Sequence, residues 1–315
     1  MTQIDKPLIT ITGILGKQGY SAARTLLQSG VYRVRGLTRR IDSPEAQELV
    51  AMGAELVNIP LALGYQKEFT DAFRGSYGVF MMTPGIAPPE THEVELGIQL
   101  ADAAVTAGVK HIIFSSLENV DQITDSKKFA PHFTDKGRIE AYIRTLPVTS
   151  SFIYMAFFYT NFMEFYTPYV EENKLIFPIY LPKDFRAPFV DPLTATGPAV
   201  LEVFSNPYLY AGQSLPVIGD MISPQEMVDT FVKVTGKKAV YRSAFKREEF
   251  LEQFHDLRGN DALVQEILGM AEYAVEYGYF RKDRNWNWSR QINPQNLTWE
   301  QFLRTTGWQG QKVSF

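Results

Sequence analysis

Three glycines close to the amino terminus, Gly13, Gly16 and Gly19, constrain the fold more than any other feature of the sequence. They follow a β-branched run, Leu8–Thr12, and precede a segment whose apolar residues recur at helical spacing. In a strand–loop–helix unit the first glycine permits the sharp turn and the second admits a phosphate group to the backbone, while the third lets helix and sheet pack closely. The triplet therefore predicts the first unit of an α/β fold.

The start of the helix after this turn is expected to bind a diphosphate. Backbone N–H groups at Lys17 and Gln18 would face the anion, and the positive end of the helix dipole favours it. Glycines are also common in surface turns, so their spacing alone is weak evidence. Their place between a strand and a helix is what predicts a dinucleotide-binding loop.

Residues 1–155 alternate short apolar runs with helical patterns, which is typical of a parallel sheet covered by helices. One helix is expected to open at Ser43-Pro44, and a longer one to open at Pro88-Pro89 and end at Gly108. Right-handed crossovers between the strands would make a doubly wound Rossmann sheet. Its strands are expected at residues 8–12, 31–37, 55–59, 77–82, 110–116 and 148–155.

Beyond residue 155 aromatic residues dominate and prolines interrupt the apolar runs. All four tryptophans lie between Trp286 and Trp308, which predicts an aromatic-rich closing segment. We expect a nucleotide-binding Rossmann domain over residues 1–155 and a smaller C-terminal α+β lobe over residues 156–315. The lobe would complete the cleft through a packed junction and not a flexible linker. Its helices are expected at residues 224–235, 247–254 and 262–277.

The composition excludes several functional classes. The absence of cysteine rules out disulfides, a thiolate nucleophile and a cysteine-based zinc site. The histidines lack metal-ligand spacing, so no metal site is expected, and a formal net charge of -4 with mixed signs gives little support for direct nucleic-acid binding. The first residues have no cationic region followed by a long apolar stretch, and no segment approaches the roughly 18 apolar residues that span a membrane, so we expect neither a signal peptide nor a membrane span. We expect a cytoplasmic protein without membrane contact, and entry into the nucleus stays open.

The end of the second predicted strand bears on the choice of dinucleotide. It ends at Gly36-Leu37-Thr38-Arg39-Arg40, with no carboxylate at its tip. In NAD-specific folds an acidic residue binds the ribose 2′-hydroxyl there, whereas arginine pairs with a 2′-phosphate and stacks on adenine. The alternative is a solvated Arg-Arg turn. We expect Arg39 to bind the phosphate with support from Arg40, and hence NADP(H) as the cofactor in preference to NAD(H).

Lys136 shares a predicted helical stripe with Ile139 and Ile143, near the start of its helix. There it can reach a nicotinamide ribose at the carboxyl ends of the strands; the alternative is a lysine that snorkels from a fraying helix end. Short-chain dehydrogenases usually carry a catalytic tyrosine four residues before such a lysine, and here that residue is His132. Histidine can act as an acid or base near neutral pH, or be structural. Lys136 and His132 are therefore the catalytic candidates.

Ser115 and Ser116 end the fifth predicted strand. A hydroxyl at that position often orients a bound molecule, and Ser115 is a candidate for the cofactor site. Both serines can equally form hydrogen bonds at a strand end.

At this point the sequence resembles the NmrA-like family, atypical members of the short-chain dehydrogenase/reductase superfamily. The likeness covers nearly the whole chain, and its most specific parts surround Lys136 and Asn161. The residues that carry it are Gly13, Gly16, Gly19, Thr38-Arg39, Met82-Thr83-Pro84, Phe114-Ser115-Ser116, Pro131–Gly137, Phe157–Asn161 and Leu297–Leu303.

The resemblance implies that the dinucleotide lies in a cleft between the Rossmann domain and the smaller lobe. By the same resemblance Thr83 and Pro84 would border the nicotinamide ribose and Lys136 would bond it. Phe158 or Tyr159 would pack near the nicotinamide, and Asn161 belongs to the same cofactor-binding segment. One segment departs from the family, because a Gly-Asp pair that meets the adenine end is replaced by Asn58-Ile59-Pro60-Leu61.

Two functions follow from the resemblance. The first is a redox-sensing regulator that responds to the state of the dinucleotide and binds a regulatory protein partner; the absent tyrosine favours it. The second is an NADPH-dependent reductase of a small carbonyl, quinone or imine substrate, for which Lys136 supplies orientation and charge. A purely structural module fits poorly with an intact phosphate loop.

Overall fold

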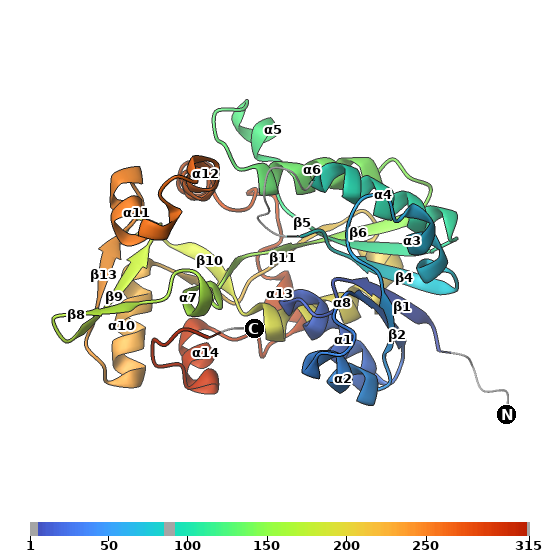
Figure 1. Ribbon diagram of the computed structural model, residues 1–315, viewed down its shortest axis with the longest axis horizontal. Coiled ribbons are helices and arrows are strands. Elements are labelled where there is room, and N and C mark those ends of the chain that lie inside the picture. The colour runs from blue at the N-terminus through green and yellow to red at the C-terminus, as the bar shows by residue number, and fades with distance from the viewer. Residues whose placement is uncertain (1–5, 85–91, 314–315) are drawn as a thin grey trace. The chain divides into compact units, whose positions relative to one another are not determined.

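The computed structural model describes residues 6–84 and 92–313, and its elements form two units (Figure 1). Unit 1 comprises residues 1–119, 134–154 and 196–215. Unit 2 comprises residues 120–133, 155–195 and 216–315. Each unit is therefore assembled from separate stretches of the chain, and each is described by itself.

The core of unit 1 is a seven-stranded sheet with the strand order β11-β6-β5-β4-β1-β2-β3. Neighbouring strands from β3 to β6 pair in parallel, as the doubly wound fold requires. The Rossmann sheet expected from the sequence is thereby confirmed. The strands are β1 (Leu8–Thr12), β2 (Arg33–Thr38), β3 (Glu55–Asn58), β4 (Ser76–Met81), β5 (His111–Ser116), β6 (Thr149–Met155) and β11 (Ser214–Val217).

Helices cover both faces of this sheet (Figure 1). On one face α8 packs so closely on α1 that a Cβ atom at Gly197 would lie 2.0 Å from the Thr25 hydroxyl. On the other, a Cβ at Gly97 of α4 would lie 2.5 Å from Ile139 of α6. The helices are α1 (Lys17–Ser29), α2 (Pro44–Ala51), α3 (Gln66–Phe73), α4 (Glu93–Thr106), α6 (Pro131–Ile143), α8 (Pro192–Ser205) and α9 (Pro207–Tyr210).

The helix-end signals in the sequence are confirmed where the structure describes them. The Ser43 hydroxyl accepts a hydrogen bond from the Ala46 N–H at 3.2 Å and caps α2. Gly108, with φ +78°, follows the end of α4. The prediction that α4 opens at Pro88-Pro89 falls outside the described residues.

The order of the strands locates the functional edge of the sheet. β1 and β4 are neighbours in the sheet although two strands separate them in the sequence, and the crossovers leave β1 toward β2 and β4 toward β5. In open α/β sheets ligands bind beside the carboxyl ends of the strands at such a reversal of strand order. The loops that follow β1, β4 and β5 therefore lie at the edge where a ligand is expected.

Unit 2 contains two three-stranded sheets, β12-β10-β7 and β13-β9-β8. Their strands are β7 (Phe157–Phe158), β8 (Tyr169–Glu171), β9 (Lys174–Ile179), β10 (Ala187–Val190), β12 (Asp220–Ile222) and β13 (Ala239–Ser243). The helices are α5 (Val120–Thr124), α7 (Asn161–Glu164), α10 (Pro224–Thr235), α11 (Arg247–Gln253), η2 (His255–Leu257), α12 (Asp261–Tyr277), α13 (Trp288–Ile292) and α14 (Trp299–Thr306).

Aromatic packing dominates the core of unit 2. Trp299 lies 5.2 Å from Tyr159 and 5.6 Å from Phe302 between ring centroids. Trp288, Trp299 and Trp308 are all buried, which confirms the aromatic-rich closing segment expected from the sequence.

Candidate functional site

The glycine turn after β1 has the geometry that a phosphate-binding loop needs. Gly13 has a φ of +62°, which a residue with a side chain rarely adopts, and its carbonyl accepts a hydrogen bond from the Gly16 N–H at 2.9 Å. A Cβ atom at Gly19 would lie 2.4 Å from the Gly13 carbonyl oxygen and 2.8 Å from the Ile14 Cα. Gly13 therefore makes the turn, and Gly19 lets α1 lie directly against it.

The amino terminus of α1 is open to an anion. Gly16 is the N-cap residue of α1, no side chain caps the first turn, and no acidic residue lies in it. Gly16 is also exposed, so the turn is not sealed from solvent. Lys17 and Gln18 are the first residues of the helix and are half-buried. A diphosphate beside Gly16 would meet backbone N–H groups and the positive end of the helix dipole.

Two side-chain hydrogen bonds fix this turn to the neighbouring strands. The Thr12 hydroxyl donates to the Met82 carbonyl at 2.8 Å and accepts from the Met82 N–H at 2.7 Å, which ties the end of β1 to the end of β4. The Ser115 hydroxyl, at the end of β5, donates to Oε1 of Gln18 at 2.8 Å. Ser115 therefore forms a hydrogen bond at the strand end, and its place in the cofactor site stays a prediction.

Arg39 and Arg40 lie at the end of β2, and both are exposed. The Arg40 backbone N–H donates to the Thr38 hydroxyl at 3.1 Å. Across residues 6–84 and 92–313 the Arg39 guanidinium forms no hydrogen bond or ion pair with another residue. Its charge is therefore available to a ligand, as the prediction for a 2′-phosphate requires.

Lys136 is almost fully buried, 9% exposed, on the same side of α6 as the fully buried Ile139 and Ile143. Its ammonium group donates to the carboxylate of Glu93 and, at 3.1 Å, to the Pro84 carbonyl. The predicted position on a buried stripe is confirmed, and the lysine does not snorkel into solvent.

Glu93, the first residue of α4, is a member of this cluster that the sequence did not single out. Its side chain is 8% exposed, and its Oε1 accepts from Lys136 and, at 2.5 Å, from the Thr83 hydroxyl. In the sequence it was one acidic residue near the start of a predicted helix, a position that the helix dipole explains equally well. Thr83, Pro84, Glu93 and Lys136 thus form one hydrogen-bonded group at the end of β4.

His132 lies one helical turn before Lys136 on α6 and is described within unit 2. Oε1 of Glu266, on α12, accepts from the His132 backbone N–H at 2.9 Å and lies 2.7 Å from its Nδ1. Both side chains are 11% exposed. Because an ionised carboxylate can only accept, Nδ1 carries the proton and Nε2 is the nitrogen left for other partners.

The three aromatic-segment residues implied by the resemblance all belong to unit 2. Tyr159 is fully buried against Phe189, Trp299 and Phe302, and its burial raises the pKa of its hydroxyl well above the usual value. It packs as a core residue. Phe158 and Asn161 are only half-buried, so Phe158 is the member of the aromatic pair with ring surface to offer.

The departure from the family at residues 58–61 brings an apolar side chain to the glycine turn. A Cβ atom at Gly13 would lie 3.6 Å from Cδ1 of Leu61, which is half-buried. Asn58 is exposed at the end of β3. Leu61 therefore borders the loop on which the adenine half of a dinucleotide is expected to lie.

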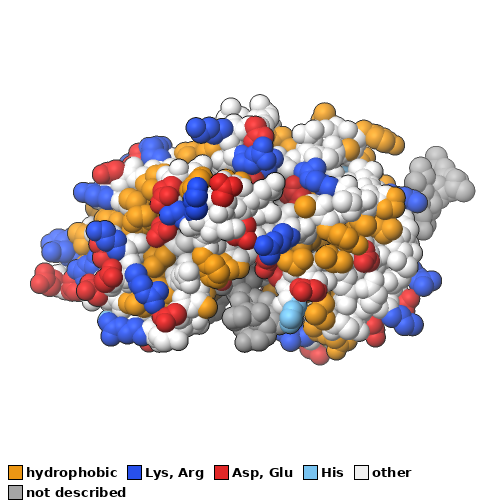
Figure 2. Space-filling model, turned by 90° about the horizontal axis from the view of Figure 1, so that it is seen from above, with side chains coloured by type: hydrophobic (Ala, Val, Ile, Leu, Met, Phe, Trp, Pro, Cys, Tyr) orange, Lys and Arg blue, Asp and Glu red, His pale blue; other side chains and the backbone are white. Residues whose placement is uncertain are grey.

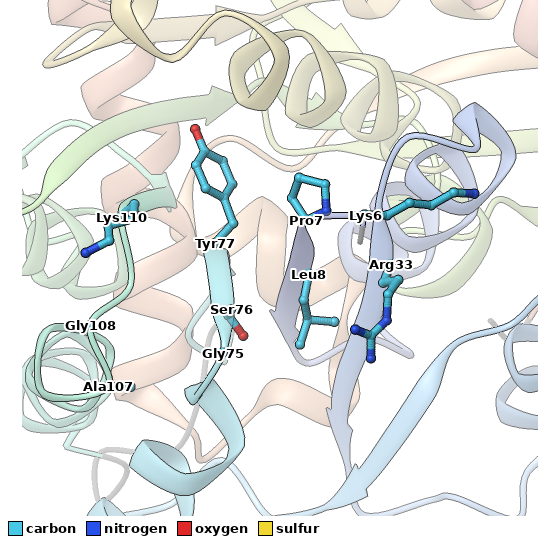
Figure 3. A pocket seen from close by; sticks show the side chains of 10 residues that line it. All are labelled: Lys6, Pro7, Leu8, Arg33, Gly75, Ser76, Tyr77, Ala107, Gly108 and Lys110. Carbon is cyan, nitrogen blue, oxygen red and sulfur yellow. The ribbon is translucent and has the colours of Figure 1, made fainter. Parts of the chain in front are cut away.

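A separate hollow of about 350 Å³ lies at the opposite edge of the sheet, beside the amino ends of β1 and β4 (Figure 3). It is wide open to solvent, and one of its cations, Arg33, is paired with Glu55 at 2.5 Å. It shares no residue with the glycine turn or the Lys136 cluster and is not part of the candidate site. Its lining residues are Lys6, Pro7, Leu8, Arg33, Gly75, Ser76, Tyr77, Ala107, Gly108 and Lys110.

Figure 2 shows a face on which acidic and basic side chains are interspersed with apolar ones. Within the described part of the chain, no three histidine or acidic residues are grouped closely enough to hold a metal ion. In the same residues no helix is both long and apolar enough to cross a membrane.

Comparison with known proteins agrees with this geometry. The sequence profile of the NmrA-like family matches residues 5–303. A curated relative, an NmrA-like family domain-containing oxidoreductase of Aspergillus hancockii, is 32% identical over 260 residues, which make up 77% of this chain and 77% of the relative. The resemblance drawn from the motifs is therefore confirmed.

Two solved structures share the fold of the chain. The negative transcriptional regulator NmrA, in complex with NADP, aligns with a TM-score of 0.76 at 22% identity, over 95% of this chain and 94% of that one. An NADPH-dependent quinone oxidoreductase from Escherichia coli, complexed with NADPH, aligns with a TM-score of 0.75 at 17% identity, over 95% and 99% of the two chains. The likeness establishes the α/β fold.

Proposed function

This chain belongs to the NmrA-like family, and we propose that it is an NADP(H)-dependent oxidoreductase that reduces a small carbonyl, quinone or imine. The observation that carries the proposal is the uncapped, exposed start of α1 behind a turn in which glycine is sterically required. The naming of a relative as an oxidoreductase supports the same class of reaction.

The residues of unit 1 fit the phosphorylated dinucleotide. Gly16 is the exposed N-cap residue of α1, so a diphosphate beside it would meet no side chain of that residue. Arg39 offers an unpaired guanidinium at the end of β2, where the phosphate on the adenosine ribose would lie. Thr83, Pro84 and Lys136 would meet the nicotinamide half.

The residues on α6 supply the groups that a reduction requires. Bound NADPH supplies a hydride to the acceptor carbon, and the acceptor's oxygen or nitrogen must then gain a proton. We assign that proton to Nε2 of a doubly protonated His132 ring, whose Nδ1 is held in place by the Glu266 carboxylate. His132 replaces the tyrosine of the short-chain dehydrogenases, and Lys136 orients the ribose one turn further along the helix.

A redox-sensing regulator is the second candidate, favoured by the pairing of Lys136 with Glu93. The ion pair neutralises the ammonium group that would otherwise lower the barrier to proton transfer. A regulator of this kind would bind NADP(H) and NAD(H) with different affinities, and it would not catalyse hydride transfer with either dinucleotide. A transcriptional regulator solved in complex with NADP has the same fold, which supports this second candidate.

Steady-state kinetics and calorimetry together distinguish the two functions. The purified protein is titrated with NADPH and NADH, and NADPH oxidation is then followed by absorbance with a panel of quinones, enones, aldehydes and imines. The reductase is supported if the turnover rate falls at least about tenfold in His132→Phe but not in the control His255→Phe. His255 is an exposed histidine. Tight NADPH binding without turnover of any acceptor supports the regulator, and no binding of either dinucleotide would refute both.

A further inference from the structure

Among residues 6–84 and 92–313, the cluster at the end of β4 leaves one donor and one acceptor without partners. Lys136 has three N–H donors, of which two go to Glu93 and Pro84. Oε1 of Glu93 accepts hydrogen bonds from Lys136 and from the Thr83 hydroxyl. Its other carboxylate oxygen, Oε2, accepts none from any residue in 6–84 or 92–313. A third Lys136 N–H and the Glu93 Oε2 are therefore held next to each other by the same ion pair.

The cluster is rigid as well as incomplete. Both side chains are about nine-tenths buried, and each is fixed by a second contact, Glu93 by the Thr83 hydroxyl and Lys136 by the Pro84 carbonyl. The Glu93 side chain is only 8% exposed, so a hydroxyl that donates to its Oε2 forms a stronger hydrogen bond than it would with a carboxylate at the surface. The site is built for a ligand that brings a donor and an acceptor side by side.

We propose that Glu93 and Lys136 together recognise a vicinal diol, with one hydroxyl accepting from Lys136 and its neighbour donating to Oε2 of Glu93. Neighbouring hydroxyls on a ribose ring present this combination. Glu93 is thus a ligand residue for the nicotinamide ribose and not merely the counter-ion of Lys136, an inference that rests on the proposed dinucleotide binding.

The ion pair with Lys136 also explains why the Glu93 carboxylate is tolerated in a largely buried position. Replacing either member alone leaves an uncompensated buried charge, which is strongly unfavourable. A ribose analogue that lacks the donating hydroxyl leaves Oε2 without a partner, so the site rejects it. Glu93 therefore contributes specificity for an intact ribose and does not act on the adenine half of the dinucleotide.

Calorimetric titration of Glu93→Gln with NADPH and with 2′,5′-ADP tests this assignment, because 2′,5′-ADP lacks the nicotinamide half. The amide has nearly the same shape but presents N–H donors where Oε2 accepts. We expect NADPH affinity to fall about tenfold to a hundredfold while 2′,5′-ADP affinity stays within about twofold. Glu95→Gln is the matched control, since Glu95 lies on the same turn of α4 with its side chain 60% exposed.

An NADPH analogue without the 2′-hydroxyl on its nicotinamide ribose, and the isomer without the 3′-hydroxyl, complete the test. At least one of the two analogues should bind to the wild type and to Glu93→Gln with equal affinity, because the hydroxyl that Glu93 recognises is missing from it.

If Glu93→Gln lowers the melting temperature by more than a few degrees, Glu93→Asp replaces it in the titrations with NADPH and 2′,5′-ADP. Aspartate keeps the negative charge on a side chain shorter by one methylene group. Unchanged NADPH affinity, or an equal loss for 2′,5′-ADP, would overturn the role of Glu93 alone. Failure of the wild type to bind NADPH and 2′,5′-ADP would instead overturn the proposed function.

Discussion

The Thr12 hydroxyl both donates to and accepts from the backbone of Met82, and this double hydrogen bond joins the ends of β1 and β4. The two strands are adjacent in the sheet but 70 residues apart in the sequence. The glycine turn begins one residue after Thr12, and Thr83 follows Met82 directly. The bond therefore sets the distance between the phosphate loop and the Lys136 cluster.

Thr12→Val should weaken both the fold and the site. Valine has nearly the same shape as threonine, but it leaves the buried N–H and carbonyl of Met82 without partners, at a cost of about 1–3 kcal/mol for each group. We expect a free energy of unfolding lower by about 2–4 kcal/mol and weaker binding of NADPH, measured by urea denaturation and calorimetry. Thr12→Ser keeps the hydroxyl and should lose less than half as much.

Gly16→Asp should abolish NADPH binding. Gly16 has a φ of -75°, so a side chain does not strain its backbone, and the effect comes from the carboxylate beside the diphosphate. Two unit charges about 4 Å apart repel by about 4 kcal/mol at an effective dielectric constant of about 20, roughly a thousandfold in affinity. Gly16→Asn has the same size without the charge, and calorimetry should find it much closer to the wild type. Equal loss in both variants would assign the effect to crowding.

Arg39→Ala should narrow the preference for NADP(H) over NAD(H). The guanidinium has no partner to lose within the described residues, so its removal should affect only the ligand. A hydrogen bond to a charged group contributes about 1.5–3 kcal/mol, which predicts about a tenfold to hundredfold loss for NADPH and little change for NADH. Lys110→Ala, an exposed cation at the other edge of the sheet, is the control. A parallel loss for both dinucleotides would contradict the assignment.

The sequence predicted the strands of the parallel sheet well because the central strands β1, β4, β5 and β6 are mostly buried and carry nearly continuous apolar runs. Ile9, Val79 and Ile113 are fully buried in β1, β4 and β5. The glycine triplet was equally informative, because close packing at Gly19 leaves no room for a side chain. Val31 was expected in the second strand but lies outside it and is 52% exposed, because β2 begins at Arg33.

Helix α8 was not predicted from the sequence. Gly197 and Pro198 lie inside it, and both residue types disfavour a helix interior. Tertiary contacts compensate, because the Gly197 N–H donates to the Ser21 hydroxyl of α1 at 2.9 Å, and a larger residue at this position would collide with Thr25. Nothing local in the sequence marks residues 196–215 as part of unit 1.

Glu93 and Glu266 were missed for a related reason. Each acts through a residue far away in the sequence, Glu93 through Lys136 and Glu266 through His132, at separations of 43 and 134 residues. An acidic residue in a helix is ordinarily a solvated side chain, and burial alone distinguishes these two. Pairings of this kind depend on the three-dimensional fold and leave no periodic signal.

His111, at the start of β5, has a tautomer that the structure fixes. It is 1% exposed, and its Nε2 lies 2.9 Å from the Ser151 hydroxyl, which itself donates to the Tyr210 carbonyl. Ser151 must therefore accept, so Nε2 carries the proton. Nδ1 is buried with no hydrogen-bond partner among the described residues. A second proton on this ring would have no acceptor.

Stability should therefore fall on mild acidification, through His111. Burial lowers the pKa of the His111 imidazole from 6.5 to about 4, so the unfolded chain takes up its proton at a higher pH than the folded protein. The contribution of the neutral ring is complete above pH 6.5 and is lost as the pH falls toward 4. One pKa unit corresponds to about 1.4 kcal/mol, which predicts that the free energy of unfolding falls by about 2 kcal/mol between pH 7 and pH 5.

Urea denaturation at these two pH values tests this prediction. In His111→Phe the difference in the free energy of unfolding between pH 7 and pH 5 should be smaller by this amount, whatever the effect of the substitution at pH 7. His255→Phe, which replaces an exposed ring, should leave the difference unchanged, and a pH dependence unaltered in His111→Phe would assign the acid sensitivity to other groups.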